Sequence, residues 1–283
     1  MSDPMLATET PSGPEHDRQM PIIEHLVELR RRLIYSFVGF LICFGIAFWK
    51  SDLVFNFLAD PLAHALGEGR RMIYTDLTEA FFTRVKLASW TAAFLAFPVI
   101  ATQAWMFIAP GLYKNERSAF WPFLVATPVL FFMGAALLYY FIIPMAWEFF
   151  LSFQQLAPEG GIGLPIQFEG KVNEYLSLIM SLIFAFGIAF ELPVLLTLLA
   201  KVGIVSSAGL ASKRRYAVVV AFVVAAVVTP PDIISQVGLA IPLILLYEIS
   251  IWSAKLIERN RAKAEAKRDA DLGINDDEPR LTI

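Results

Sequence analysis

Residues 119–147 read AFWPFLVATPVLFFMGAALLYYFIIPMAW, a stretch of 29 residues without a charged side chain. A helix rises about 1.5 Å per residue and needs about 20 apolar residues to cross the hydrocarbon core of a bilayer. This stretch therefore predicts a transmembrane helix. Its prolines, Pro128 and Pro144, each remove a backbone hydrogen bond, so we expect irregularities that neighbouring helices compensate.

Five further apolar stretches occur on either side of this one, at residues 33–49, 87–109, 176–200, 216–228 and 233–247. Over the whole chain of 283 residues, 57% are hydrophobic and 17% are charged, and the mean hydropathy is +0.60. Such a composition excludes an ordinary soluble domain. We therefore expect an all-α integral membrane protein whose membrane domain, residues 21–257, contains six transmembrane helices.

The lysine and arginine residues predict the orientation of these helices. The N-terminal segment, residues 110–118, residues 201–215 and the tail after residue 252 hold 17 of the 23 basic residues. Because basic residues collect on the cytoplasmic side, both termini are predicted to be cytoplasmic. The tryptophans support the spans, since each lies within a few residues of a predicted end, where an indole can lie among headgroups: Trp49, Trp90, Trp105, Trp121, Trp147 and Trp252.

The last two apolar stretches are unusually short, with 13 and 15 residues. Helices of this length measure about 20 Å, whereas the hydrocarbon core is about 30 Å thick. The sequence TPPD at residues 229–232 predicts a tight turn, so the pair should form a short hairpin that stops below the outer surface or thins the bilayer. Alternatively, polar ends such as residues 213–215 and Glu248 snorkel and lengthen the two helices.

The remaining segments are predicted to lie outside the membrane. Residues 50–86 are long enough for short amphipathic helices, with Ser51 or Asp52 as the N-cap of one and Thr78 as the N-cap of another, so this connection should form a structured cover outside the membrane. Residues 148–175 predict irregular chain. An N-terminal extension of residues 1–20 and a charged tail of residues 258–283 are predicted to be disordered, and neither requires a function.

The sequence contains no recognisable catalytic or cofactor site. Its histidines, His16, His25 and His64, lie outside the predicted helices, and the single cysteine, Cys43, lies inside the first. No HExxH, CxxC or complete phosphate-binding loop occurs. We therefore expect no enzyme activity, metal, cofactor or nucleic-acid partner, and any work that the protein does must be driven from elsewhere.

Glu191, in FELP at residues 190–193, is the only carboxylate well inside a predicted membrane helix. A buried acid in lipid is costly unless it is paired, protonated or hydrated, so it indicates a functional or water-filled site. A structural hydrogen bond to a neighbouring helix is the alternative. Asp232 and Gln236 add polarity near the short hairpin, where Asp232 equally suits a turn or a helix cap.

Two further acids, Glu28 and Glu116, lie beside apolar stretches on the predicted cytoplasmic face. One interpretation is that they are ordinary interfacial carboxylates neutralised by Arg30, Arg32 or Arg117. The other is that the fold brings them together as a receptor for a cation. Two carboxylates suit guanidinium groups, whose planar donors form short bidentate hydrogen bonds.

These motifs resemble those of the TatC family, the multispanning core subunit of the twin-arginine protein translocase. The resemblance covers roughly residues 20–255. It rests on HLVELRRR at residues 25–32, FIAPGLYKNER at 107–117, FGIAFELP at 186–193 and TPPD at 229–232. It implies a concave, glove-like helical bundle in the cytoplasmic (inner) membrane.

The resemblance also implies a function, a set of partners and roles for particular residues. The protein would recognise Arg-Arg signal peptides of folded proteins and, with single-span TatA and TatB partners, export them using the proton motive force. Several copies are expected in the complex. Glu28 and Glu116 match the family's signal-binding acids, and the last two helices would dock the partners, with the neighbourhood of Glu191 and Gln236 receiving a polar group. Further positions are associated with signal recognition or translocation: Arg30, Arg32, Gln103, Phe107, Pro61, Glu191 and Asp232.

Two departures and one alternative accompany the resemblance. Residues 1–19 have no counterpart in the family pattern, and the additional Glu24 leaves open how many acids share the signal site. The alternative function is proton-coupled transport of a small solute, with Glu191 as the proton carrier. No repeat relates the first three stretches to the last three, which weakens this alternative.

Overall fold

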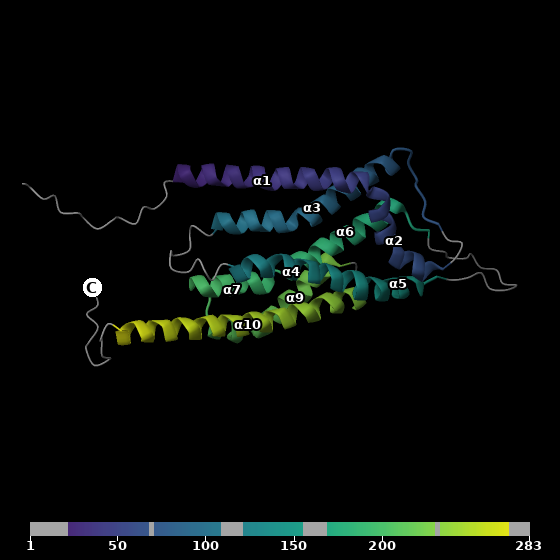
Figure 1. Cartoon of the computed structure of the whole chain (residues 1–283). Helices are drawn as coiled ribbons and strands as arrows, with labels where there is room; N and C mark the ends of the chain where they lie inside the picture. Colours follow the sequence, from purple (N-terminus) through teal and green to yellow (C-terminus); the bar gives the residue numbers. More distant parts are fainter. Residues whose placement is uncertain (1–21, 68–70, 109–120, 155–168, 230–232, 272–283) are drawn as a thin grey trace, which may run out of the picture.

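The structure is a computed structural model that describes residues 22–67, 71–108, 121–154, 169–229 and 233–271. These residues are almost entirely helical, and the only β-type pairing among them is an isolated bridge between Ile73 and Lys171. The helices form an elongated bundle (Figure 1). In chain order they are α1 (Ile22–Trp49), α2 (Ser51–Leu66), α3 (Glu79–Ile108), α4 (Trp121–Leu137), the π-helix η3 (Leu138–Ile142), α5 (Ile143–Leu151), α6 (Val172–Ala189), α7 (Leu192–Val202), α8 (Ser207–Ser212), α9 (Arg214–Val228) and α10 (Ile233–Asp271).

Five helical segments within the described residues are long and apolar enough to cross a bilayer. They are Ile23–Trp49, Glu79–Phe107, Pro122–Leu151, Val172–Val202 and Ile233–Arg268. They coincide with the first four predicted stretches and the last one. α9 has only 15 residues, so the prediction of a short fifth apolar helix is confirmed. α3 begins directly after Thr78, as expected for the connection between the first two spans. α2 also lies where a helix was expected, but Lys50 occupies its N-cap position, so the prediction of Ser51 or Asp52 as the cap is wrong.

The last helix is not short. α10 has 39 residues, so the predicted end at residue 247 is wrong, and residues 258–271 of the tail predicted to be disordered are helical. Glu248 does not end the helix because its carboxylate accepts hydrogen bonds from Arg214 Nε and Nη2 on α9, at 2.6 and 2.8 Å. Further along, the alanines, glutamates, lysines and arginines favour a helix. Residues 1–20 and 272–283, also predicted to be disordered, lie outside the described residues.

The helix formed by the 119–147 stretch is interrupted but not broken. The five residues of η3 separate α4 from α5, and Pro144 lies in the first turn of α5. Proline lacks an N–H and its ring collides with the preceding turn of an α-helix. A π turn directly before the proline widens the backbone there and relieves the collision. The irregularity expected at Pro144 is therefore a π turn, and the helix continues to Leu151.

Two glycines let α4 and α6 approach closely. A Cβ on Gly134 would lie 2.6 Å from the carbonyl oxygen of Phe186, and a Cβ on Gly187 would lie 2.5 Å from the ring of Phe131. Small residues at such contacts allow membrane helices to pack tightly. This contact holds the end of α6, and with it the junction between α6 and α7, against α4.

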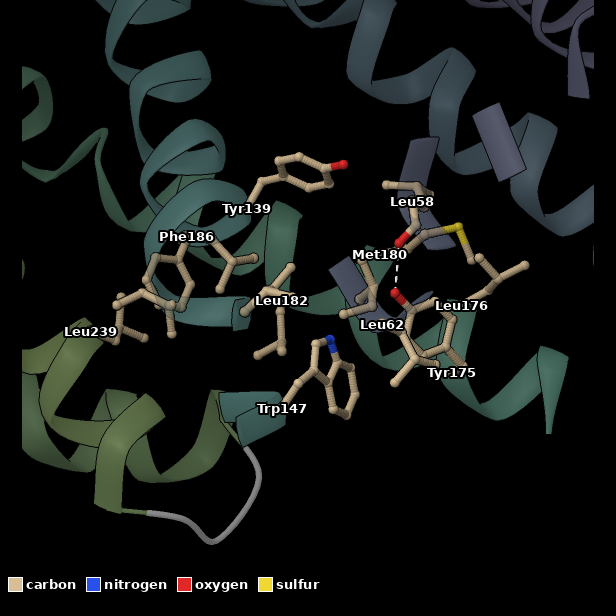
Figure 2. Close-up of a cluster of buried hydrophobic side chains, with 14 of the residues drawn as sticks. Leu58, Leu62, Tyr139, Trp147, Tyr175, Leu176, Met180, Leu182, Phe186 and Leu239 are labelled. Carbon is tan, nitrogen blue, oxygen red and sulfur yellow. Dashed lines mark hydrogen bonds between the residues drawn. The ribbon is translucent and has the colours of Figure 1, made fainter. Parts of the chain in front are cut away.

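The largest buried cluster joins α2 to η3, α5 and α6. Figure 2 shows Leu58 and Leu62 of α2 facing side chains from the later helices. Tyr175 Oη donates a hydrogen bond of 2.5 Å to the carbonyl oxygen of Leu58, drawn there as a dashed line. Other members of the cluster are Tyr139, Trp147, Leu176, Met180, Leu182, Phe186 and Leu239.

Pro61 explains why a second tyrosine bonds to α2. Pro61 lies inside the helix and has no N–H, so the carbonyl of Phe57, four residues earlier, lacks its normal partner. Tyr139 Oη donates to that carbonyl oxygen at 2.6 Å. The hydroxyl of Tyr139 therefore replaces the hydrogen bond that Pro61 removes.

We expect Tyr139→Phe to lower the free energy of unfolding by about 1–3 kcal/mol, because it leaves the Phe57 carbonyl without a donor. In a Pro61→Ala background the same change should cost much less, since residue 61 then supplies its own N–H. Unfolding of the unmodified protein, the two single variants and the double variant in one detergent measures the coupling energy between Tyr139 and Pro61. Equal costs of Tyr139→Phe in both backgrounds would contradict the assignment.

Candidate functional site

The start of α1 and the end of α3 lie side by side (Figure 1). Arg32 Nη2 donates to Glu28 Oε1 at 3.1 Å, and Arg32 Nη1 donates to Gln103 Oε1 at 3.2 Å. Nη1 also lies 3.6 Å from the sulfur of Met106. The side chains of Arg32 and Glu28 are only 18% and 14% exposed, so this ion pair is well shielded from solvent. We call Glu28, Arg32, Gln103 and Met106 the guanidinium seat.

Phe107, near the end of α3, makes a further contact between α1 and α3, closer to the start of α1. Its ring stacks on His25 with 4.3 Å between the centroids and 20° between the planes. Sequence reasoning singled out Phe107 but missed His25. The spacing of His25, Glu28 and Arg32, three and four residues apart, places them on one face of α1 and could have identified it. Arg30 is exposed and makes none of these contacts.

Glu28 is thus already paired with a basic residue of its own chain. For Glu28 the structure agrees with the interpretation of local neutralisation by Arg32. Only Oε1 takes part, and no described residue donates a hydrogen bond to Oε2. Glu116 lies outside the described residues, so its closeness to Glu28 stays a prediction. The seat itself shows that this surface can hold a guanidinium group.

Glu191 lies at the junction of α6 and α7, directly before Leu192 and Pro193. Its Oε1 is buried and has no hydrogen-bond partner among the described residues. The carboxyl group also interacts with the hydroxyl of Thr127 on α4. That hydroxyl accepts a hydrogen bond of 2.9 Å from Trp105 Nε1 on α3. A short polar chain therefore links three helices and ends in a carboxyl oxygen with capacity left to accept.

This carboxyl group borders a cavity of about 650 Å³ between α7, α9 and α10. Apart from Glu191, Thr127 and Lys213, the lining is apolar or aromatic, with Leu195, Val220, Val224, Leu243 and Tyr247 among its residues. Gln236 does not line it, so the expected common neighbourhood of Glu191 and Gln236 is not a single cavity. Asp232 lies outside the described residues. An unsatisfied carboxyl oxygen beside an apolar space can accept a hydrogen bond from a polar group that enters it.

Residues 24–242 match the family model described as Sec-independent protein translocase protein (TatC). The chain belongs to the TatC family. Among its relatives, the TatC protein of Magnetococcus marinus is 52% identical over 270 residues, covering 93% of this chain and 95% of the relative. The TatC protein of Escherichia coli strain K12 is 40% identical over 235 residues, covering 83% and 88%. A crystal structure described as the twin-arginine translocase receptor TatC superposes with a TM-score of 0.68 at 41% identity, covering 83% of this chain and 99% of that one.

Membership of the TatC family confirms the resemblance found in the sequence. The protein is a multi-pass membrane protein and a subunit of the twin-arginine translocase, a complex that includes other subunits. The relatives give no support to a small-solute transporter.

Proposed function

We propose that this subunit recognises Arg-Arg signal peptides at the surface formed by the start of α1 and the end of α3. The observation that carries the proposal is the guanidinium seat, in which Glu28 and Gln103 hold the side chain of Arg32. A carboxylate and an amide oxygen at these distances match the planar donors of arginine, which lysine cannot reproduce. The same surface therefore has the chemistry to bind an arginine from another chain.

One arginine of the signal peptide binds Oε2 of Glu28, the carboxylate oxygen that Arg32 does not use. The second arginine of the signal peptide binds Glu116. Arg32 limits the negative charge of the empty site and holds the Glu28 carboxylate in its orientation between signals. Arg32, Gln103 and Phe107 are then positioning residues, and Arg30 on the exposed side of α1 contacts the signal's flanking chain.

The apolar stretch of the signal follows the concave face of a glove-like bundle. An apolar cavity of about 420 Å³ between α2, α3, η3 and α6 supports such a path, with Phe57, Trp90 and Phe94 in its lining. In this arrangement α9 is the fifth of six membrane helices and is too short to span without thinning the bilayer or snorkelling ends. Both termini lie in the cytoplasm, and the membrane is the cytoplasmic (inner) one.

TatA-like and TatB-like single-span partners dock on α9 and α10 near the Glu191 cavity. A polar group on the partner helix donates to Glu191 Oε1, which no described residue occupies. The assembled translocase contains several copies of this subunit and takes its energy from the proton motive force. Gln236, in the first turn of α10, contacts the partner outside this cavity, and Asp232 is assigned the same role.

Photocrosslinking tests the signal-binding surface directly. A photoreactive residue at Val27, which is 62% exposed beside Glu28, should crosslink to a bound Arg-Arg signal peptide and not to its Lys-Lys counterpart. The control position is Trp252, 82% exposed on α10 at the opposite side of the bundle (Figure 1). Crosslinks of equal yield at both positions, or to both peptides, would rule out this surface as the receptor.

A further inference from the structure

The end of α3 opposite the guanidinium seat carries large apolar side chains that the other described residues leave exposed. Leu77, just before the helix, is 98% exposed, and Phe81 and Phe82 in its first turn are 59% and 64% exposed. The two phenylalanine rings meet edge to face, with 5.5 Å between their centroids. Trp49, the last residue of α1, is 80% exposed. We call Trp49, Leu77, Phe81 and Phe82 the apolar rim. Signal recognition and partner docking make no use of it.

The height of the apolar rim follows from the packing of α1 against α3, which run antiparallel (Figure 1). Two contacts fix their register. One is the guanidinium seat, and the other is the approach of Gly39 to Val99, where a Cβ on the glycine would lie 3.2 Å from Val99 Cγ1. Counted from these two contacts, Trp49 lies level with residues 86–89 of α3.

This level marks one edge of the hydrocarbon core. The apolar run of α1 ends at Trp49, and the next residue is charged. The Nζ atom of Lys50 lies 5.0 Å from the centroid of the Trp49 ring, so the charge remains close to the indole. A tryptophan followed by a lysine is typical of the boundary between hydrocarbon and headgroups.

Phe81 and Phe82 lie beyond this edge, at the depth of the headgroups. Phe82 is four to seven residues further along α3 than residues 86–89, which corresponds to about 6–10 Å. Each headgroup layer is about 5–8 Å thick, because a bilayer measures about 40–45 Å with its headgroups and about 30 Å without them. Consecutive side chains leave a helix about 100° apart. The two rings therefore suit surrounding lipid better than one flat protein surface.

The backbone on either side of Leu77 is suited to a layer that is poor in water. The N–H groups of Thr75 and Asp76 donate to Glu79 Oε2 at 2.8 and 3.3 Å. The N–H group of Thr78 donates to Asp76 Oδ1 at 3.2 Å. Donors at a helix start that lack such partners are costly to remove from water. These hydrogen bonds therefore let the turn enter the headgroup layer at low cost.

The charged residues around the apolar rim balance one another. Residues 49–52 and 76–86 contain three basic and three acidic side chains: Lys50, Arg84, Lys86, Asp52, Asp76 and Glu79. Arg84 and Asp52 form an ion pair between α3 and α2, and Lys86 donates to Ser177 Oγ on α6. These two segments carry no excess charge that would select an anionic lipid, so apolar and aromatic contacts provide the attraction.

We propose that the apolar rim anchors this end of the subunit in the bilayer, with Leu77, Phe81 and Phe82 inserted among zwitterionic headgroups. Lipid is the occupant because the rim continues two membrane-crossing segments, Ile23–Trp49 and Glu79–Phe107, which contain all of it except Leu77. Aromatic side chains favour the headgroup layer. The anchor holds the start of α3 at a fixed depth and, through the ion pair of Arg84 with Asp52, also the start of α2.

The depth of a spin label at position 77 tests the proposal. Leu77→Cys is made in a Cys43→Ser background, because Cys43 is the only native cysteine. The full chain carries a nitroxide and is reconstituted in phosphatidylcholine vesicles, where collisions with oxygen and with a water-soluble nickel chelate are measured. The references are Val38→Cys, 47% exposed on α1, for lipid and Lys263→Cys, exposed on the charged part of α10, for water. We expect the label at position 77 to collide with nickel about fivefold less often than the label at position 263.

Two results would overturn the proposal directly. Nickel collisions as frequent as at position 263 would place Leu77 in water, whereas low collision rates with both reagents would show that protein covers it. In the labelled chain, Phe81→Ser with Phe82→Ser should raise nickel collisions by about threefold. The control, Asp52→Asn with Arg84→Gln, removes the ion pair without changing the net charge and should leave them unchanged. Equal effects of the two double variants would also contradict an apolar anchor.

Discussion

Glu28→Ala is expected to weaken binding of an Arg-Arg signal peptide by at least about 30-fold, which corresponds to about 2 kcal/mol. The substitution removes the carboxylate of the guanidinium seat, and the remaining acceptor, Gln103 Oε1, already bonds to Arg32. A neutral amide forms a weaker hydrogen bond to a guanidinium than a carboxylate does. Glu28→Gln should therefore show most of the same loss while preserving the shape of the side chain.

The matched control for Glu28 lies one turn earlier. Glu24 is also acidic and is exposed on α1, yet no described residue forms an ion pair with it. Glu24→Ala should change binding by less than about twofold, as expected for a surface charge. Peptide titration by fluorescence anisotropy measures all three variants. Unchanged affinity after Glu28→Ala, with a folded and monodisperse protein, would show that the seat only stabilises α1 against α3.

Glu191→Leu is expected to stabilise the isolated subunit and to abolish export by the assembled translocase. Oε1 of Glu191 is buried without a hydrogen bond among the described residues, and such a group costs about 1–3 kcal/mol. An apolar side chain of similar size removes this cost, so the melting temperature should rise by a few degrees. If partners dock as proposed, the same change removes the acceptor for their polar group, and copurification of single-span partners should fall by about tenfold or more.

A second residue of the same cavity separates loss of the acceptor from loss of shape. Leu195 lies one turn further along α7 and lines the cavity with Glu191. Leu195→Ala removes apolar surface but no polar group, so it should weaken the association with partners less than Glu191→Leu does. Thermal unfolding and quantitative copurification provide the two readouts. If Glu191→Leu lowered the melting temperature and left partner association intact, Glu191 would be a structural residue only.

The positions of most membrane helices followed from the sequence because hydrocarbon thickness dictates long uncharged stretches. The failure at α10 has a specific cause. Glu248 was taken as the end of a span, but its charge is compensated by Arg214, which lies 34 residues earlier in the chain. Only the fold brings α9 and α10 together, so no local pattern predicts that a charged residue continues the helix there.

In the candidate site, too, the contacts between residues close in sequence could be predicted, whereas the contacts between distant helices could not. The contact of Glu28 with Arg32 spans four residues on one helix, and neutralisation by Arg32 was one of the two interpretations that the sequence allowed. Gln103 and Met106 are 71 and 74 residues away from Arg32, so their contacts depend on how α1 packs against α3. Glu191 could be identified as unusual from sequence, but the apolar cavity beside it could not, since its walls come from α3, α4, α6, α7, α9 and α10.

The unbroken length of α10 has a mechanical consequence. Its 39 residues measure about 58 Å, nearly twice the thickness of the hydrocarbon core, so a stiff rod extends well beyond the lipid. Leu243 and Tyr247, on the same rod, form part of the wall beside Glu191. A force that tilts the protruding end of α10 therefore also moves Leu243 and Tyr247, so a load applied outside the membrane changes the shape of the cavity beside Glu191.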